Sequence, residues 1–175
     1  MQTNFQRSLD AVLRTEGGYN DDPQDSGGAT NFGVTQNVYD AYRTKSALPH
    51  QSVRYINQIE VAAIYKSQYW DLINGDNLPE GLDYAVFDFA VNSGVGRAAR
   101  FLQAVVGVPQ NGAIGPTTLA AIQTHGVKKT IDDICARRLS FLEHLPNFGH
   151  FPGWVTRDHD VDVEADREAA AGTVA

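Results

Sequence analysis

The sequence predicts a mainly α-helical fold with one small irregular β-hairpin. Apolar residues recur at helical spacing in successive segments of the 175-residue chain. A polar, glycine-rich run at residues 16–35 interrupts them early, and its short stretch 29–35 can form a hairpin. Hydrophobic residues make up 42% of the chain, which is enough for a real core, so we expect one compact domain.

The first predicted helix opens at Thr3 and ends near Glu16. Thr3 and Gln6 have the spacing of a capping box. The apolar residues that follow lie on one helical face: Phe5, Leu9, Val12 and Leu13. Gly17 and Gly18 then favour a helix stop, because glycine adopts the left-handed conformation that such a stop requires. We therefore expect Glu16 at a helix C-terminus, facing a polar loop.

The run that begins at Glu16 resembles the N-terminal signature of glycoside hydrolase family 108. The residues that carry this resemblance are Glu16-Gly17-Gly18-Tyr19, Asp22-Pro23, Asp25, Gly27-Gly28, Thr30 and Gly33-Val34-Thr35. Members of the family are lysozyme-like N-acetylmuramidases, many of them phage endolysins. The resemblance implies a lysozyme-like helical domain with the hairpin next to a catalytic Glu16. A glutamate before a glycine pair is by itself more often a solvated helix-end residue, and the resemblance reverses that preference.

The reaction that the resemblance implies is hydrolysis of the β-1,4 bond between N-acetylmuramic acid and N-acetylglucosamine. Such hydrolysis generally needs two carboxyl groups. With Glu16 as the proton donor, the loop offers Asp21, Asp22 and Asp25 as the second group. Phage-type lysozymes of a different family use a Glu, an Asp and a Thr in similar order. By this analogy we choose Asp25, with Thr30 positioning the water.

Other residues of the loop are candidates for binding the polysaccharide. Tyr19 is predicted either to form a hydrogen bond in the cleft or to pack beneath it. Four glycines suit a backbone that a sugar chain approaches closely, although loop geometry alone also explains them: Gly17, Gly18, Gly27 and Gly28.

Two helices are predicted after the hairpin. The first covers residues 36–43, and the second covers residues 56–70 after a polar connection at residues 44–54. Tyr69 and Trp70 end the second helix. They are candidates for stacking on sugar rings, but aromatic residues at helical spacing are more often core residues.

The segment 80–92 predicts the most hydrophobic helix. It is apolar nearly all round, so we expect it to be buried. Asp83 and Asp88 must then lie on a narrow polar edge or find partners. Asn92 precedes a glycine break that resembles one in family 108, where the asparagine points towards the cleft. Asn92 is therefore a substrate-binding candidate, with a helix-cap role as the alternative.

Three more helices are predicted in the second half of the chain. They cover residues 97–106, a segment that has Pro116 in its first turn and continues through 119–124, and residues 128–145. Asn111-Gly112-Ala-Ile114-Gly115-Pro116-x-Thr118 resembles the compact helical motif of peptidoglycan-binding modules.

These observations predict three regions along the chain. Residues 1–92 form the lysozyme-like catalytic region, and residues 93–156 form a peptidoglycan-binding-like region packed into the same body. Residues 157–175 form an acidic tail, which we expect to be a solvated final helix with a frayed end.

Composition limits the partners. The net charge of −7 argues against nucleic acid, and no apolar run approaches the roughly 20 residues that span a bilayer, so stable membrane insertion is not expected. No cluster has zinc spacing and no glycine-rich loop ends in Gly-Lys-Ser/Thr, so we expect neither a metal nor a cofactor. The lone Cys135 suits a core position and excludes an internal disulfide. We expect a monomer whose partner is bacterial peptidoglycan.

The start of the sequence shows no secretory signal pattern. We therefore expect synthesis in the cytoplasm and action on the cell wall, in the periplasm, after release. Two alternatives to a muramidase stay open. A lytic transglycosylase needs only one acid, and a non-catalytic wall-binding or localisation module needs none. The intact set of Glu16, Asp25 and Thr30 favours an active enzyme.

Overall fold

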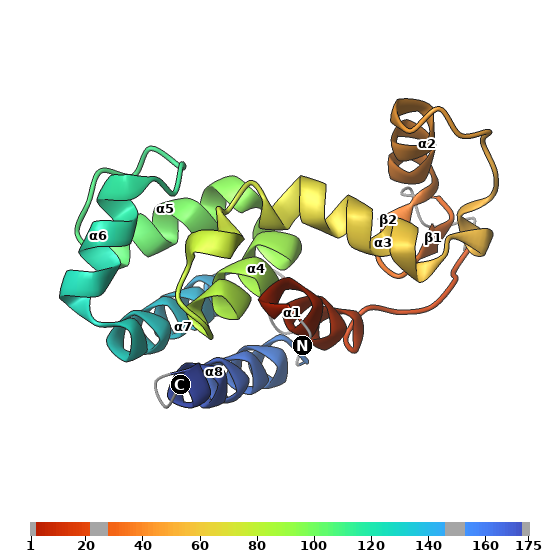
Figure 1. Ribbon diagram of the computed structural model, residues 1–175. Helices are drawn as coiled ribbons and strands as arrows, with labels where there is room; N and C mark the ends of the chain where they lie inside the picture. The colour runs from red at the N-terminus through yellow and green to blue at the C-terminus, as the bar shows by residue number, and fades with distance from the viewer. Residues whose placement is uncertain (1–2, 22–27, 146–152, 173–175) are drawn as a thin grey trace. The chain divides into compact units, whose positions relative to one another are not determined.

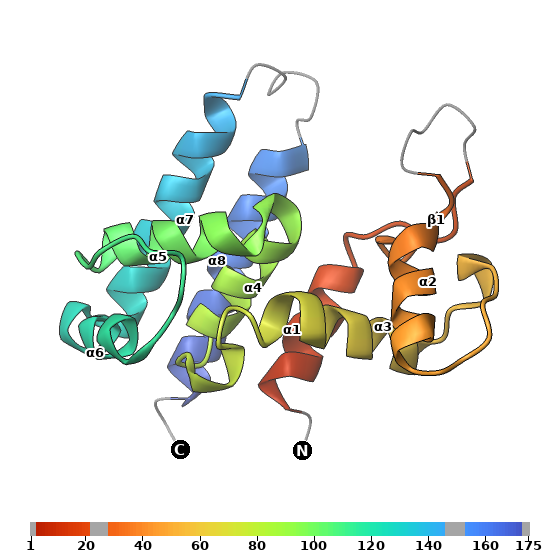
Figure 2. The same cartoon turned by 90° about the horizontal axis from the view of Figure 1, so that it is seen from above.

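A computed structural model describes residues 3–21, 28–145 and 153–172 of the chain. Within these ranges it contains eight α-helices and one two-stranded antiparallel sheet, which confirms the mainly α prediction (Figures 1 and 2). The elements are α1 (Asn4–Leu13), β1 (Thr30–Asn31), β2 (Val34–Thr35), α2 (Gln36–Lys45), η1 (Val53–Tyr55), α3 (Gln58–Tyr65), η2 (Lys66–Trp70), η3 (Gly75–Asn77), α4 (Leu82–Ser93), α5 (Val95–Val105), α6 (Pro116–His125), α7 (Val127–Glu143) and α8 (Gly153–Gly172). η1 and η3 are 3₁₀ turns, and η2 is a single π-helical turn.

The chain divides into two compact units. The hairpin unit is Leu9–Gln68, and the helical unit is Met1–Ser8 together with Tyr69–Ala175. These units have different boundaries from the three regions predicted from the sequence. In the helical unit, α4 packs on α5, α7 and α8, so elements from all three predicted regions share one core.

The helix α4 is the centre of the helical unit. Every residue from Leu82 to Ala90 is buried, as its nearly continuous apolar sequence predicts. Its two aspartates have partners, as burial of a charge requires. Asp83 accepts hydrogen bonds from the Asn4 side chain at 2.9 Å and from two backbone amides of its own turn. Asp88 pairs with Arg138 of α7 and Arg157 of α8, each at 2.7 Å.

The final helix is packed rather than solvated, which corrects the expectation for the acidic tail. Val161 and Ala165 of α8 are 2% and 0% exposed, because this face lies on α4 and α7. Gly81 allows the close approach: a Cβ atom there would lie 2.2 Å from the Ala165 carbonyl oxygen. Among the many acidic residues of this helix, Val161 and Ala165 form a narrow apolar stripe that is buried.

The segment that resembles peptidoglycan-binding modules is organised by one buried side chain. The Gln103 amide donates to Asn111 Oδ1 at 2.7 Å and to the Ala113 carbonyl at 3.0 Å, and it accepts from the Gly112 amide at 2.9 Å. Pro116 begins α6, as predicted. Cys135 is buried in the core of the same unit, also as predicted.

The hairpin unit contains a buried polar network beside its apolar residues. Arg43 and Glu60, both buried, pair at 2.6 Å, and the Tyr39 hydroxyl donates to the other Glu60 oxygen at 2.7 Å. Glu60 also closes a capping box with Asn57 at the start of α3. This network fixes the connection between α2 and α3 beside the hairpin.

Candidate active site

Glu16 follows the end of α1 instead of standing on it. The helix ends at Leu13, and Thr15 closes it by donating from its amide and its hydroxyl to the Val12 carbonyl, at 3.0 and 2.8 Å. Neither Gly17 nor Gly18 has a positive φ, so the predicted left-handed glycine stop is wrong. The threonine hydroxyl supplies the stop that was assigned to the glycines.

No structural requirement for glycine is seen among the described residues at the two positions after Glu16. A Cβ atom added at Gly17 or at Gly18 would meet no heavy atom of the described residues within 4 Å. Because neither conformation nor packing requires glycine there, the backbone beside the half-buried Glu16 is open to an approaching molecule.

The hairpin is formed by a two-residue turn between paired strands. Thr30 pairs with Thr35 and Asn31 pairs with Val34. The turn residues Phe32 and Gly33 have φ values of 50° and 72°, and positive values at both positions are those of a type I′ turn. A non-glycine residue in this region costs about 1 kcal/mol or more, and such residues concentrate at functional sites.

The turn is where the Glu16 carboxylate and the Tyr65 hydroxyl meet. A Cβ atom at Gly33 would lie 2.9 Å from Glu16 Oε2 and 2.6 Å from the Tyr65 hydroxyl oxygen. Tyr65 is 2% exposed, and its hydroxyl donates to the Phe32 carbonyl at 2.9 Å. A methyl group at position 33 would therefore force one of these two polar groups to move, and both lie next to the turn.

Thr30 lies on the same hairpin, with its backbone fully paired. Its amide and carbonyl exchange hydrogen bonds of 2.8 and 2.9 Å with Asn20. The hydroxyl of its cross-strand neighbour Thr35 caps α2 by accepting from the Val38 amide. Asp25, the predicted second carboxyl group, lies outside the described residues. The roles assigned to Glu16, Asp25 and Thr30 stay predictions.

Tyr19 is at the surface of the hairpin unit. Its side chain is 38% exposed, and its hydroxyl donates to Asp21 at 3.1 Å. The Arg54 guanidinium lies over its ring, 5.2 Å from the ring centre. Its substrate-binding role remains a prediction.

The other three substrate-binding candidates belong to the helical unit. Trp70 is fully buried, makes edge contacts with Phe5 and Phe87, and donates from its indole nitrogen to Asp76 at 2.7 Å. It fills the core role that the sequence left as the alternative to sugar stacking. Tyr69 is half-buried, and Asn92 is exposed, with Oδ1 accepting from the Ser93 hydroxyl at 3.1 Å.

Sequence reasoning missed two residues that shape this site. No pattern in the sequence singles out Tyr65, and Arg54 lies at the end of the predicted polar connection 44–54. The contact of Tyr65 with Phe32 joins residues 33 positions apart, so no local pattern announces it. The one available signal was Gly33, which belongs to the signature and lies in the predicted hairpin.

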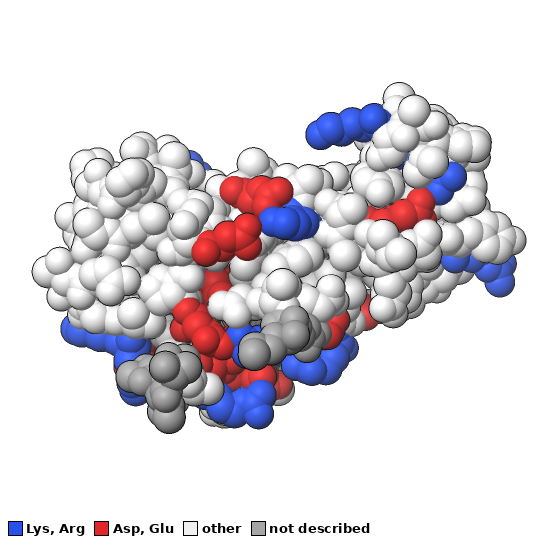
Figure 3. Space-filling view, viewed as in Figure 1, with Lys and Arg blue, Asp and Glu red and all other residues white. Residues whose placement is uncertain are grey.

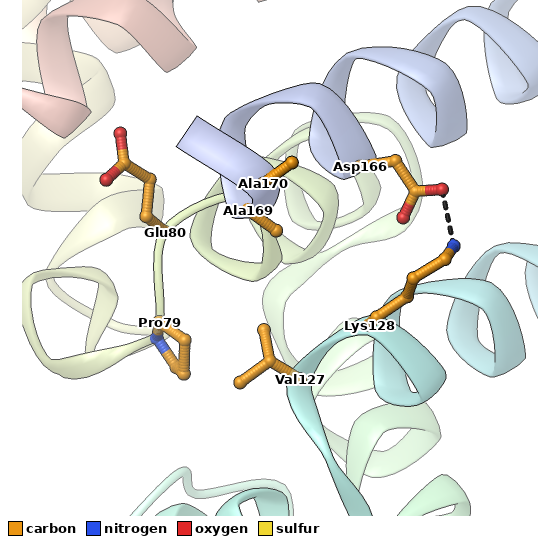
Figure 4. A pocket seen from close by; sticks show the side chains of 7 residues that line it. All are labelled: Pro79, Glu80, Val127, Lys128, Asp166, Ala169 and Ala170. Atoms are coloured by element: carbon orange, nitrogen blue, oxygen red, sulfur yellow. Dashed lines mark hydrogen bonds and ion pairs between the residues drawn. The ribbon is translucent and has the colours of Figure 1, made fainter. Parts of the chain in front are cut away.

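A cleft of about 360 Å³ in the helical unit contains none of the predicted site residues (Figure 4). Its lining includes Pro79, Val127 and Ala169, and an ion pair of 2.6 Å between Lys128 and Asp166 closes one side. Among residues 3–21, 28–145 and 153–172, no three His, Cys, Asp or Glu side chains group as metal ligands. In the same ranges, no helix combines the length and hydropathy needed to cross a membrane.

Comparisons with known proteins find a family match and similar solved structures. A family model described as Glycosyl hydrolase 108 matches residues 9–94. The solved structure of Brucella abortus SagA is similar over nearly the whole chain: the TM-score is 0.81 and the sequence identity 38%, covering 94% of this chain and 95% of that one. No curated protein matches this chain.

Proposed function

Since the chain belongs to the glycosyl hydrolase 108 family, which implies a peptidoglycan hydrolase, we propose that it is an N-acetylmuramidase with Glu16 as its general acid. It cleaves the β-1,4 bond between N-acetylmuramic acid and N-acetylglucosamine. Glu16 donates a proton to the oxygen of the leaving sugar while the bond at the muramic C1 breaks.

The observation that carries this proposal is the placement of Glu16 against the hairpin turn. Its carboxylate lies beside Gly33, where no side chain intervenes, and the buried Tyr65 supports the same turn. A general acid must keep a fixed direction towards the atom that it protonates, so a carboxylate that lies against a hydrogen-bonded turn suits this role. The open backbone at Gly17 and Gly18 supplies room for a sugar chain next to that carboxylate.

The second group in this proposal comes from the segment that joins Asn20 to Thr30. Asp25 holds the attacking water or stabilises the developing positive charge, and Thr30 positions the water. The enzyme works as a monomer on the wall, in the periplasm, after synthesis in the cytoplasm and release.

Replacement of the proposed acid tests the function directly. Glu16→Gln keeps the shape of the side chain but removes the proton that it donates, so turnover of purified peptidoglycan should fall on the order of 10²–10⁴-fold. Mass spectrometry of the wild-type digest should find reducing N-acetylmuramic acid ends. Glu143→Gln, the same change at an exposed position on α7, should leave the rate unchanged and serves as the matched control.

Three outcomes would count against the proposal. Unchanged lysis by Glu16→Gln would remove Glu16 from the chemistry. Anhydro-muramic ends in the wild-type digest would identify a lytic transglycosylase. A wild-type protein that binds peptidoglycan and releases no fragments would be a binding module.

A further inference from the structure

Arg54 is an exposed cation held in a fixed place on the hairpin unit. Its guanidinium lies over the Tyr19 ring, and Tyr19 follows Glu16 by three residues. Cation–π contact at an exposed site is worth about 0.5–1 kcal/mol, enough to favour one orientation of a long side chain.

The backbone under Arg54 is fixed to the hairpin. The Asn31 side-chain amide, 6% exposed, donates to the carbonyls of Val53 and Arg54 at 3.3 and 3.2 Å. The Val53 amide donates to the Gln36 side chain at 2.7 Å. The turn η1 is therefore held by both sides of the hairpin, since Asn31 belongs to β1 and Gln36 directly follows β2.

The stacked guanidinium keeps its hydrogen-bond donors available. Within the described ranges, Arg54 forms no ion pair and donates no side-chain hydrogen bond. A contact of this guanidinium with the ring does not use its N–H donors, which lie on the edge of the planar group. That edge matches the two oxygens of a carboxylate, and an arginine whose orientation is already set loses less entropy on binding one.

The stacking also changes what Tyr19 can do. One face of its ring is covered by Arg54, so that face does not stack on a sugar. The neighbouring Tyr55 is 69% exposed and adds aromatic surface beside the cation. A ligand suited to this surface combines sugar rings with negative charge.

We propose that Arg54 is a specificity-determining residue that binds a carboxylate carried by the glycan substrate. The assignment of a peptidoglycan substrate rests on the proposed function. Two parts of peptidoglycan supply this chemistry: the lactyl group of N-acetylmuramic acid and the peptide stem attached to it. If Arg54 served only to cover the Tyr19 ring, its substitution would weaken the binding of charged and uncharged glycans alike.

The test measures binding by the full-length Glu16→Gln protein, which does not consume its ligands. Three soluble probes are titrated by calorimetry. Chitooligosaccharides carry no carboxylate, peptide-free peptidoglycan strands carry only the lactyl carboxylate, and strands with intact stems carry the peptide carboxylates. Arg54→Gln removes the charge, while Arg54→Lys keeps the charge and loses the planar fork.

Arg54→Gln should weaken binding of a carboxylate-bearing probe about fivefold and leave chitooligosaccharide binding unchanged. A loss with peptide-free strands identifies the lactyl group, and a loss confined to strands with stems identifies the peptide. Arg54→Lys should recover part of the loss. Asp21→Asn removes an acid from the Tyr19 hydroxyl and should tighten binding of the same probe. The selective loss should shrink at high salt because the pair is exposed.

Equal losses for charged and uncharged probes would overturn the proposal and make Arg54 structural. Unchanged binding of all three probes by Arg54→Gln would also overturn it. These outcomes are independent of the lysis assay. If Glu16→Gln keeps full lytic activity, the proposed role of Glu16 fails. The charge-selective loss still decides the role of Arg54, because binding can be measured before the probe is digested.

Discussion

The charged groups of the two units of this chain have different roles. In the helical unit, Asp88 is a single carboxylate between two guanidinium groups, and it joins three helices around an aromatic core. In the hairpin unit, the buried pair of Arg43 and Glu60 fixes a connection, and the candidate acid lies on a strained turn. On the face drawn in Figure 3, most acidic side chains belong to the helical unit.

We therefore expect the helical unit to contribute mainly to stability and the hairpin unit mainly to the reaction. A change in the core of the helical unit should mainly affect the free energy of unfolding. A change at the hairpin turn should mainly affect the rate of the reaction. The comparison fails if substitutions in the two units have the same balance of effects on folding and on activity.

The largest effect is expected at Asp88. Asp88→Asn leaves Arg138, 2% exposed, facing a neutral group, and an uncompensated buried charge costs about 3–5 kcal/mol of unfolding free energy. Urea denaturation followed by circular dichroism measures this loss. Asp132→Asn breaks an exposed i,i+4 pair with Lys128 and should cost at most about 0.5 kcal/mol. A loss below 1 kcal/mol for Asp88→Asn, the order expected of a surface pair, would contradict the role given to it.

The next effect is expected in the rate, at Gly33. Gly33→Ala brings a methyl group against Glu16 and Tyr65, so kcat on peptidoglycan should fall about 10- to 100-fold as the carboxylate is displaced. Gly107→Ala is the matched control, because Gly107 has the same φ of 72° and no described heavy atom lies within 4 Å of a Cβ added there. Both variants share a backbone cost of about 1 kcal/mol. Equal rates for the two variants would show that the contact with Glu16 does not matter.

The smallest effect is a dependence of stability on pH that belongs to the helical unit. Burial raises the pKa of Glu168 to about 7 and that of Asp83 to about 6. Repulsion from Asp83 adds to the shift of Glu168, and repulsion from Glu80 adds to that of Asp83. Arg7 and Glu80 face the same cluster and pair with each other. Because both folded-state values lie above the ordinary values of 4.5 and 3.8, the stability present below pH 4 is lost as pH rises towards 7.

Glu168→Gln should remove part of this loss. At pH 8 the variant should be more stable than the wild type by about 1 kcal/mol, a figure reduced for solvent screening, and the two should converge near pH 4. Urea titrations at several pH values measure the difference, with the exposed Glu143→Gln as the control. A wild-type stability that rises between pH 5 and 8 would contradict the assignment.

Local signals predicted local structure well. Thr3 and Pro116 start helices where their side-chain chemistry predicts, and the acids of α4 have the partners that burial demands. The prediction failed where two solutions to one problem exist. Thr15 ends α1 through its hydroxyl, and the glycine pair that was expected to do so is left for another purpose.

Contacts between distant residues were beyond the reach of sequence patterns. Tyr65 contacts Phe32, which lies 33 positions earlier in the sequence, and Arg54 likewise contacts the distant Tyr19. Each contact depends on a fold that brings two loops together, while helical periodicity describes only one segment at a time. The signature contains Glu16 and Gly33 separately, and only the structure shows that the Glu16 carboxylate occupies the space beside Gly33.

The pairing of Asn20 with Thr30 has a consequence for engineering. Two backbone hydrogen bonds join these residues, so both ends of the nine-residue segment between them are fixed next to each other. Lengthening a closed loop raises its entropic cost only slowly. Segments of other lengths that keep Asp25 can therefore be grafted between these two residues while the turn at Gly33 keeps its geometry, which makes this segment a place to alter the substrate preference proposed for the protein.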